Sequence, residues 1–158
     1  MFPELMRKNQ RLSQEECLRL LREETRGVLS VLGEGGYPYG TPMNHWYEEK
    51  DGCIYFHCGK SGHKNDAIAR SDKASFCVMD QGFRREGEWA LNIKSVVVFG
   101  RIQPMTDLKE AFAVLRQLCL KYTQEPGFFS REMAESGKNV LILRLVPEHI
   151  TGKLVNES

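Results

Sequence analysis

Two basic side chains stand where an apolar stretch gives way to a helical pattern. The segment Phe56-His57-Cys58-Gly59-Lys60-Ser61-Gly62-His63-Lys64 passes through glycines into a predicted helix over residues 63–70. A helix N-terminus binds phosphate because its first N–H groups are free and its dipole end is positive. We hypothesise that His63 and Lys64 hold a phosphate group, with Ser61 as the helix cap. The alternative is a solvated basic loop. The Gly-x-x-x-x-Gly-Lys-Ser pattern of a Walker loop is absent.

His57 is the second candidate, because it ends an apolar stretch and could face a pocket. An imidazole near its ordinary pKa of about 6.5 can donate a proton at neutral pH. The alternative is a structural histidine that hydrogen-bonds a neighbouring strand. Cys58 could form a reactive thiolate, but the nearby sequence has no acidic partner for a Cys-His pair. Trp46, Tyr47 and Trp89 could stack on an aromatic ligand, or they could fill the core or a subunit contact.

The composition fits one domain over residues 1–158. Apolar residues make up 41% of the chain, which is ordinary for a globular protein. The 22 Lys and Arg residues nearly balance 21 Asp and Glu residues, and a net charge of +1 gives no reason to expect nucleic acid or an anionic membrane as partner. The five cysteines form no Cys-x-x-Cys motif and the four histidines are scattered, so we expect neither a disulfide framework nor a metal site.

The apolar runs are all too short to span a bilayer, and the first residues do not resemble a signal peptide. We therefore expect a cytoplasmic protein.

Local patterns predict the elements that must position these residues. Ser13 and Glu16 form a capping box, which predicts a helix over residues 13–24, and Asp107 caps a helix with apolar spacing up to Tyr122. Asp51-Gly52 predicts a hairpin turn. Stretches of strand-forming residues predict six strands over 27–32, 37–47, 53–57, 74–79, 95–102 and 140–146, with a long loop over 80–92. Short strands joined by hairpins favour an antiparallel barrel over a parallel sheet.

An ordered set of motifs then carries a resemblance to a known family. The set consists of Gly27-Val28-Leu29-Ser30, Gly36 to Asn44, Ile54-Tyr55-Phe56-His57, Gly62-His63-Lys64, Ser95 to Gly100 and Thr151-Gly152-Lys153. It resembles the FMN-binding split-barrel family related to pyridoxamine 5′-phosphate oxidase. Within that family it is most similar to the nitroimidazole reductase branch, the 5-nitroimidazole antibiotic resistance proteins.

The resemblance implies a mainly β fold with flanking helices, a six-stranded antiparallel split barrel. It also implies a homodimer that binds FMN in grooves between its subunits. By analogy, the isoalloxazine is lined by Thr41, Pro42, Met43 and Asn44. Phe56, His57 and Cys58 run along the flavin, and His63 and Lys64 hold its phosphate. Ser95 and Val97 lie on the strand next to the cofactor, Trp89 comes from the partner subunit, and His57 faces the substrate as the catalytic residue.

The sequence departs from the true oxidase pattern in its phosphate motif. It has Gly62-His63-Lys64 where the oxidases have a Ser-Arg-Lys triplet, and it lacks a recognisable pyridoxal-phosphate-binding tail. The resemblance therefore favours an FMN-dependent oxidoreductase that reduces a small nitro-aromatic or quinone-like acceptor. The alternative is a non-catalytic protein that binds flavin or haem, and some family members bind a deazaflavin. An open face for the acceptor would distinguish an enzyme from a binding protein.

Overall fold

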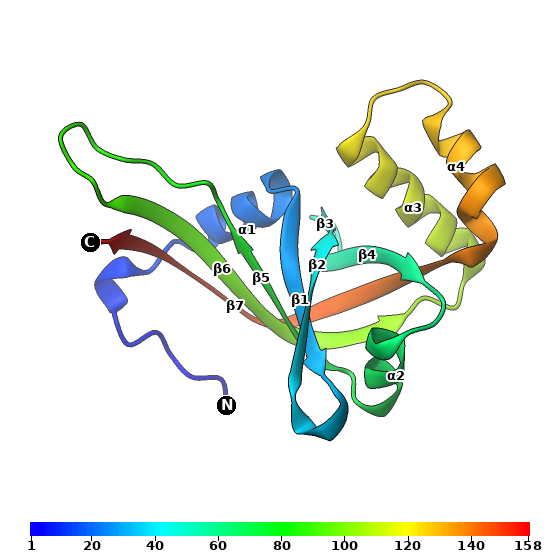
Figure 1. The fold of residues 1–158 in the computed structure, drawn as a ribbon, viewed down its shortest axis with the longest axis horizontal. Helices are drawn as coiled ribbons and strands as arrows, with labels where there is room; N and C mark the ends of the chain where they lie inside the picture. The colour runs from blue at the N-terminus through cyan, green and yellow to red at the C-terminus, as the bar shows by residue number, and fades with distance from the viewer.

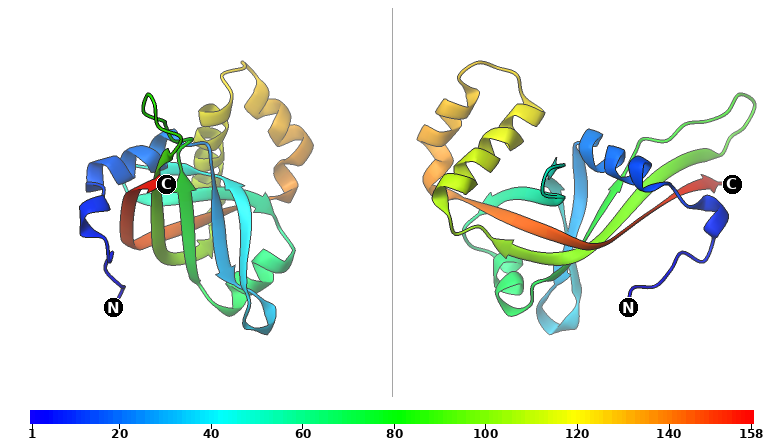
Figure 2. Two further views of the ribbon diagram at one scale, coloured as in Figure 1. Left: turned by 60° about the vertical axis from the view of Figure 1, so that its left-hand side comes forward. Right: turned by 180° about the vertical axis from the view of Figure 1, so that it is seen from behind.

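One antiparallel sheet organises the chain. The computed structural model describes residues 1–158, the side chain of Ser136 excepted. Over these residues seven strands pair in the order β2-β1-β5-β6-β7-β4-β3. Their bounds are Arg26–Leu32 (β1), Pro38–Asn44 (β2), Trp46–Glu48 (β3), Cys53–Gly59 (β4), Lys73–Met79 (β5), Leu91–Pro104 (β6) and Val140–Glu157 (β7). The sheet curls into a half-barrel around the long β6 and β7 (Figures 1 and 2), so the predicted split-barrel class is confirmed.

The prediction of six strands was wrong by one, because the stretch over 37–47 divides at His45. The backbone N–H of His45 donates to the hydroxyl of Tyr122, and its carbonyl accepts from Tyr122 and Lys121. Side chains from a helix thus take the backbone groups that a continuous strand would pair with a neighbour. β2 and β3 are the two edges of the sheet, and the prolines of β2 suit an edge position.

The helix α1 (Gln14–Glu23) packs on the sheet near the end of β7. The predicted capping box is present, with Ser13 Oγ accepting from the N–H of Glu16. Leu12 N donates to the carbonyl of Gly152 at 2.9 Å, and Gln14 Nε2 donates to the carbonyl of Ile150 at 3.0 Å. A Cβ at Gly152 would lie 2.6 Å from Cys17 Sγ, so only glycine allows the helix to seat this closely on the strand.

The core occupies the concave side of the sheet. Its buried side chains include Leu21, Leu29, Phe56, Phe76, Val98 and Leu145. The rings of Phe56 and Phe76 meet edge to face, with 4.9 Å between their centroids.

A helical hairpin covers the other face of β4. It consists of α3 (Leu108–Tyr122), capped by Asp107 as predicted, and α4 (Phe128–Ser136), which the sequence patterns did not predict. A second apolar cluster joins Tyr55 and Ile142 of the sheet to Val114, Leu115 and Leu118 of α3. Figure 1 shows this hairpin at one end of the molecule, with both termini and the β5–β6 loop at the other end.

The remaining helix, α2 (His63–Arg70), follows β4 as predicted and buries Ala67 and Ile68. Short 3-10 turns lie at Lys8–Gln10, Glu34–Gly36 and Gly137–Asn139. No helix in the described part of the chain has the length and apolar character needed to cross a membrane.

The convex face of the sheet is only partly covered. Directly paired residues place Val28, Cys77 and Val97 in one row on neighbouring strands. Their side chains keep solvent access, whereas those of their neighbours in the chain, Leu29, Phe76 and Val98, are buried. This row of apolar side chains is thus not buried in the single chain.

Candidate functional site

β2, β4 and α2 converge and bring together most of the predicted site residues. Lys64 Nζ, in the first turn of α2, lies 3.5 Å from Met43 Sδ of β2. Cys58 Sγ, near the end of β4, lies 3.8 Å from Asn65 Oδ1 of α2. Burial raises the pKa of the Cys58 thiol, and the nearby Lys64 ammonium partly opposes this rise. The thiol therefore lacks the lowered pKa that a reactive thiolate needs.

The N-terminus of α2 is open to an anion. The prediction of Ser61 as its cap was wrong, because Gly62 occupies the cap position and no described side chain bonds to the first turn. Gly62 has φ of 130°, a conformation that L side chains rarely adopt, which explains a glycine here. The first N–H groups of α2, beside His63 and Lys64, therefore have no side-chain partner among the described residues.

Two polar groups at this site lack protein partners among the described residues. The hydroxyl Oγ1 of Thr41 is buried and has no hydrogen-bond partner. The Lys64 ammonium makes no ion pair in the described part of the chain, and its only close polar contact is the weakly accepting sulfur of Met43. A buried hydroxyl without a partner normally costs stability. A ligand with a phosphate and a polar edge would satisfy both groups, so the residues fit such a ligand.

His57 faces a cavity between β4 and the α3–α4 hairpin. The cavity has a volume of about 400 Å³. It is lined by Asn44, His57, Leu115, Leu118, Cys119, Tyr122, Thr123, Phe128, Glu132 and Val140. His57 keeps solvent access, yet the surrounding atoms desolvate the imidazole and lower its pKa. Glu132 raises this pKa and Lys64 lowers it, so both charges act on the ring. The arrangement offers a titratable donor at the mouth of an apolar chamber.

The family follows from comparison with known proteins. A family model described as pyridoxamine 5′-phosphate oxidase matches residues 13–154. The chain belongs to the pyridoxamine 5′-phosphate oxidase family. No curated protein matches the sequence of this family member.

Solved structures share the fold of this member of the pyridoxamine 5′-phosphate oxidase family. A protein of Bacteroides thetaiotaomicron that carries the name of a 5-nitroimidazole antibiotic resistance protein has 19% identity and a TM-score of 0.78, over 92% of this chain and 87% of that one. A FAD-binding protein from Mesorhizobium loti has 26% identity and a TM-score of 0.67, over 92% and 97% of the two chains. The FAD-binding protein from Mycobacterium smegmatis has 17% identity and a TM-score of 0.60, over 93% and 98%.

In this oxidase-family chain, Pro42 is paired with Val28 and lies in the convex row, and four further predicted site residues also lie apart from the rest. The side chain of Phe56 is fully buried in the core, so only its backbone is left to face a ligand at this end of β4. Ser95 and Val97 lie on the convex face of β6, three strands away from β2. Trp89 is 76% exposed in the β5–β6 loop, and its carbonyl accepts from Arg84 Nε at 2.9 Å. In the described part of the chain, Ser95, Val97 and Trp89 make no contact with the site formed by β2, β4 and α2.

The sequence patterns missed Glu132, which α4 carries into the His57 cavity. The signal was weak, because α4 is short and its apolar positions Phe128, Phe129 and Met133 sit among polar residues. Pro126-Gly127 just before it is a turn signal that could have marked the start of the helix. Gly127 has φ of 78°.

A buried polar cluster behind the cavity was also missed. Lys121 Nζ donates to the carbonyls of Glu24 at 2.7 Å and His45 at 2.9 Å. Tyr122, which lines the cavity, donates to the carbonyl of Thr25 at 2.5 Å. Burial lowers the pKa of Lys121 to about 8. Burial and the Lys121 charge lower the pKa of His45 to about 3, so its imidazole is neutral. The cluster ties α3 to both α1 and the β2–β3 junction.

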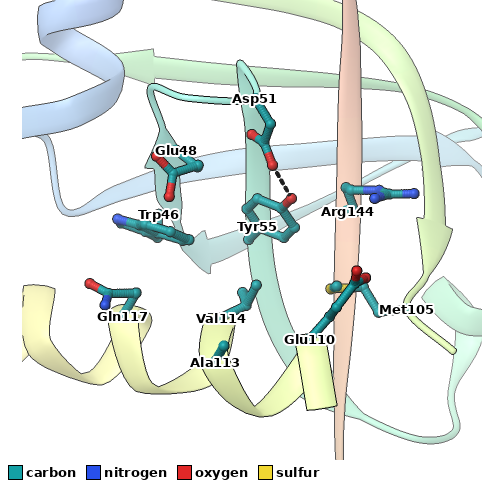
Figure 3. Close-up of a pocket in the computed structure, with 10 residues that line it drawn as sticks. All are labelled: Trp46, Glu48, Asp51, Tyr55, Met105, Glu110, Ala113, Val114, Gln117 and Arg144. Carbon is teal, nitrogen blue, oxygen red and sulfur yellow. Dashed lines mark hydrogen bonds between the residues drawn. The ribbon is translucent and has the colours of Figure 1, made fainter. Parts of the chain in front are cut away.

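A second cavity of about 400 Å³ lies beside α3 in this family member (Figure 3). Trp46 and Tyr55 form one wall, with ring centroids 5.6 Å apart, and Glu110 and Arg144 lie farther along. The hydroxyl of Tyr55 donates to Asp51 Oδ2 at 2.5 Å. Three carboxylates line this cavity, on Glu48, Asp51 and Glu110, so it carries more charged groups than the His57 cavity.

Proposed function

We propose that the chain is an FMN-dependent oxidoreductase that reduces a small nitro-aromatic or quinone-like acceptor. The observation that carries the proposal is that Lys64, at the start of α2 where no side chain caps the helix, acts on His57 at an apolar cavity. Membership of the pyridoxamine 5′-phosphate oxidase family supports it, as do the FAD-binding names of similar structures.

The phosphate end uses the start of α2. The uncapped N–H groups and the Lys64 ammonium, which has no ion-pair partner in the described part of the chain, would hold a phosphate with charge-assisted hydrogen bonds. Thr41 would give its unpaired hydroxyl to a polar edge of the ring system, next to Met43. A single helix N-terminus with one lysine suits a monophosphate, which is why we propose FMN.

The redox end uses His57. The flavin, when bound, supplies electron transfer from a reduced nicotinamide or similar donor to the acceptor. His57 donates a proton to the acceptor as the acceptor is reduced. The open cavity next to it favours an enzyme over a non-catalytic flavin- or haem-binding protein, because a binding protein needs no chamber for a second molecule.

We further propose a homodimer formed through the convex face of the sheet. Val28 is 38% exposed and Met79 is 56% exposed on this face. Apolar side chains that keep solvent access on neighbouring strands are typical of an interaction surface. The ring of Phe2 stacks on that of Phe99, with 5.6 Å between their centroids, and so covers part of β6. Ser95 and Val97 lie on this face of the sheet, and Trp89 lies in the β5–β6 loop. The dimer would bring Trp89 to the flavin of the partner subunit, which is the role predicted for it.

Extraction and mass spectrometry of the bound chromophore test the cofactor. We expect FMN at about one per chain, and reoxidation of the reduced flavin by a nitro-aromatic compound. FAD or haem in its place would refute the FMN assignment. A flavin that no acceptor reoxidises would favour the non-catalytic alternative.

Light scattering tests the dimer. We expect twice the chain mass at micromolar concentration, and the monomer mass for Val28→Asp, which places a charge in the apolar row. Leu108→Asp is the matched control, since Leu108 is 75% exposed at the first position of α3, away from the sheet face. A monomeric unmodified protein would overturn the proposal.

A further inference from the structure

The cavity at His57 has one carboxylate among its lining residues. This carboxylate is that of Glu132, and no lysine or arginine belongs to the described residues that line it. We propose that this cavity selects acceptors by charge, taking a ring-sized molecule that is neutral or cationic and rejecting one with a carboxylate or phosphate. The inference rests on the proposed function, for which it defines the class of acceptor.

The walls determine the size and polarity of the ligand. Leu115, Leu118, Phe128 and Val140 present apolar surface from α3, α4 and the start of β7. The volume of about 400 Å³ lies within the range of pockets that bind small molecules. An apolar ring therefore gains from burial here, and its polar substituent has His57 and Glu132 as the ionisable partners.

The nearest cation does not cancel the charge of Glu132 inside the cavity. Lys64 acts on His57 from the α2 side, and its ammonium lies against Met43 rather than within the cavity. On the proposed function, Lys64 is further committed to the phosphate of the flavin. An anionic acceptor would thus meet Glu132 without a compensating partner, in a space where apolar walls weaken solvent screening.

The helical hairpin is therefore the specificity element. α4 supplies Phe128 and Glu132, and α3 supplies four of the lining residues, Leu115, Leu118, Cys119 and Tyr122, while its C-cap residue Thr123 is a fifth. A change in α4 can alter which acceptor binds without touching the anion site at α2.

Calorimetry with three matched nitrobenzene compounds tests the charge preference. The probes are 4-nitrobenzyl alcohol, 4-nitrobenzylamine and 4-nitrobenzoate, which are neutral, cationic and anionic at pH 7. They are titrated into the whole oxidised protein, both as purified with its flavin and after removal of the flavin. We expect the alcohol and the amine to bind at least about tenfold more tightly than the benzoate. Equal or tighter binding of the benzoate would overturn the proposal.

Variants of α4 locate the preference. Glu132→Lys should reverse the order of the amine and the benzoate, whereas Glu135→Lys should leave it unchanged, since Glu135 is exposed on the same helix outside the cavity. An unchanged order in Glu132→Lys would contradict the assignment.

A filling substitution locates the site independently of charge. Cys119→Trp should weaken binding of the alcohol at least about tenfold, while Leu120→Trp, at an exposed neighbouring position of α3, should not. Flavin absorbance per chain and the melting temperature report whether each variant remains folded and loaded. If Cys119→Trp does not fold, the Glu132 pair still decides the question. If the protein proves to carry no flavin, charge-selective binding to the bare chain would support the cavity while the proposed function fails.

Discussion

The two cavities beside α3 share a strand face but differ in what that face offers. Tyr55 and His57 are two positions apart on β4, so both side chains point toward α3. Tyr55 donates its hydroxyl to Asp51, and burial together with that bond raises the pKa of the phenol. His57 makes no side-chain hydrogen bond among the described residues, and its pKa is lowered. A titratable side chain is available for chemistry when its polar atoms are not already hydrogen-bonded to a neighbouring residue, as the hydroxyl of Tyr55 is to Asp51.

The surroundings reinforce this difference. The Tyr55 cavity is lined by three carboxylates and Arg144, which suits a solvated surface more than a sealed chamber (Figure 3). The His57 cavity is mainly apolar, with Glu132 as its one carboxylate. An apolar environment strengthens the electrostatic interactions of the few charged groups within it. This contrast supports the proposal that the chemistry takes place on the His57 side.

The largest expected effect belongs to His57→Ala. Turnover of a nitro-aromatic acceptor per bound flavin should fall by a factor on the order of 10² or more, because the proton donor is lost. FMN occupancy and melting temperature should be retained. Tyr55→Phe is the control on the same strand face and should leave turnover unchanged. A joint fall of occupancy and melting temperature in His57→Ala, with unchanged turnover per flavin, would make His57 a structural residue.

The pH dependence sharpens the assignment. A proton donor acts in its protonated form, so turnover should fall as pH rises through the pKa of His57. Since desolvation lowers this pKa, the midpoint should lie below the ordinary value of about 6.5. Glu132 raises the pKa, so Glu132→Gln should move the midpoint to lower pH. A pH–rate profile of each variant measures this, and a midpoint that does not move would exclude the pairing.

The second effect concerns the anion site. Lys64→Ala should weaken FMN binding by about 10- to 150-fold, the equivalent of about 1.5–3 kcal/mol for a charge-assisted contact. The free energy of unfolding of the flavin-free protein should change by less than about 0.5 kcal/mol. Arg144→Gln, which removes the cation of the other cavity, should leave FMN affinity unaltered. Calorimetric titration with FMN and thermal melts check both halves. An unchanged affinity in Lys64→Ala would place the phosphate elsewhere, with Lys60 and Lys153 as the next candidates.

A third effect compares two tyrosine hydroxyls. Tyr122→Phe removes the acceptor for the buried N–H of His45 and should cost about 1–3 kcal/mol of unfolding free energy. Tyr55→Phe should cost less, about 1 kcal/mol, because its partner Asp51 is exposed and can bind water instead. Urea denaturation of both variants measures the order. The reverse order would show that the Tyr55 hydroxyl contributes more to the free energy of unfolding than the Tyr122 hydroxyl.

The smallest effect is an expected absence of change. Ala113→Trp should leave FMN affinity and acceptor turnover within about twofold of the unmodified protein, because Ala113 lines only the Tyr55 cavity. Steady-state kinetics beside the His57→Ala measurements test it. A large loss of turnover in Ala113→Trp would remove the distinction between the two cavities.

Local sequence signals predicted what local interactions determine. The capping box at Ser13 and Glu16, the Asp107 cap and the hairpin turn at Asp51-Gly52 lead to the observed elements because neighbouring residues satisfy them. The start of α2 was also readable, whereas the placement of Lys64 near Met43 of β2 followed only from the family resemblance. The site residues that share these short segments could therefore be proposed from the sequence alone.

Elements that depend on distant partners were predicted less well. The last strand was predicted over residues 140–146 but continues as β7 to Glu157, through Pro147 and Gly152, because β6 pairs with it on both sides of a bulge between Phe99 and Gly100. The helix α4 depends on packing against α3, and its placement alone brings Glu132 toward His57. Likewise, Lys121 and Tyr122 of α3 bond the backbone of His45 and interrupt the strand that was predicted over residues 37–47.

The seating of α1 on β7 has a consequence for how the chain acquires its fold. Gln14 and Ile150 are separated by 136 positions, yet the side chain of one bonds the backbone of the other. A contact of such long range cannot form until β7 has left the ribosome, and loop closure over that length is slow. The helix α1 is therefore synthesised well before the strand on which it must dock. Until then its apolar face, with Cys17, Leu20 and Leu21, is not covered by β7, and apolar surface exposed during folding is prone to aggregation.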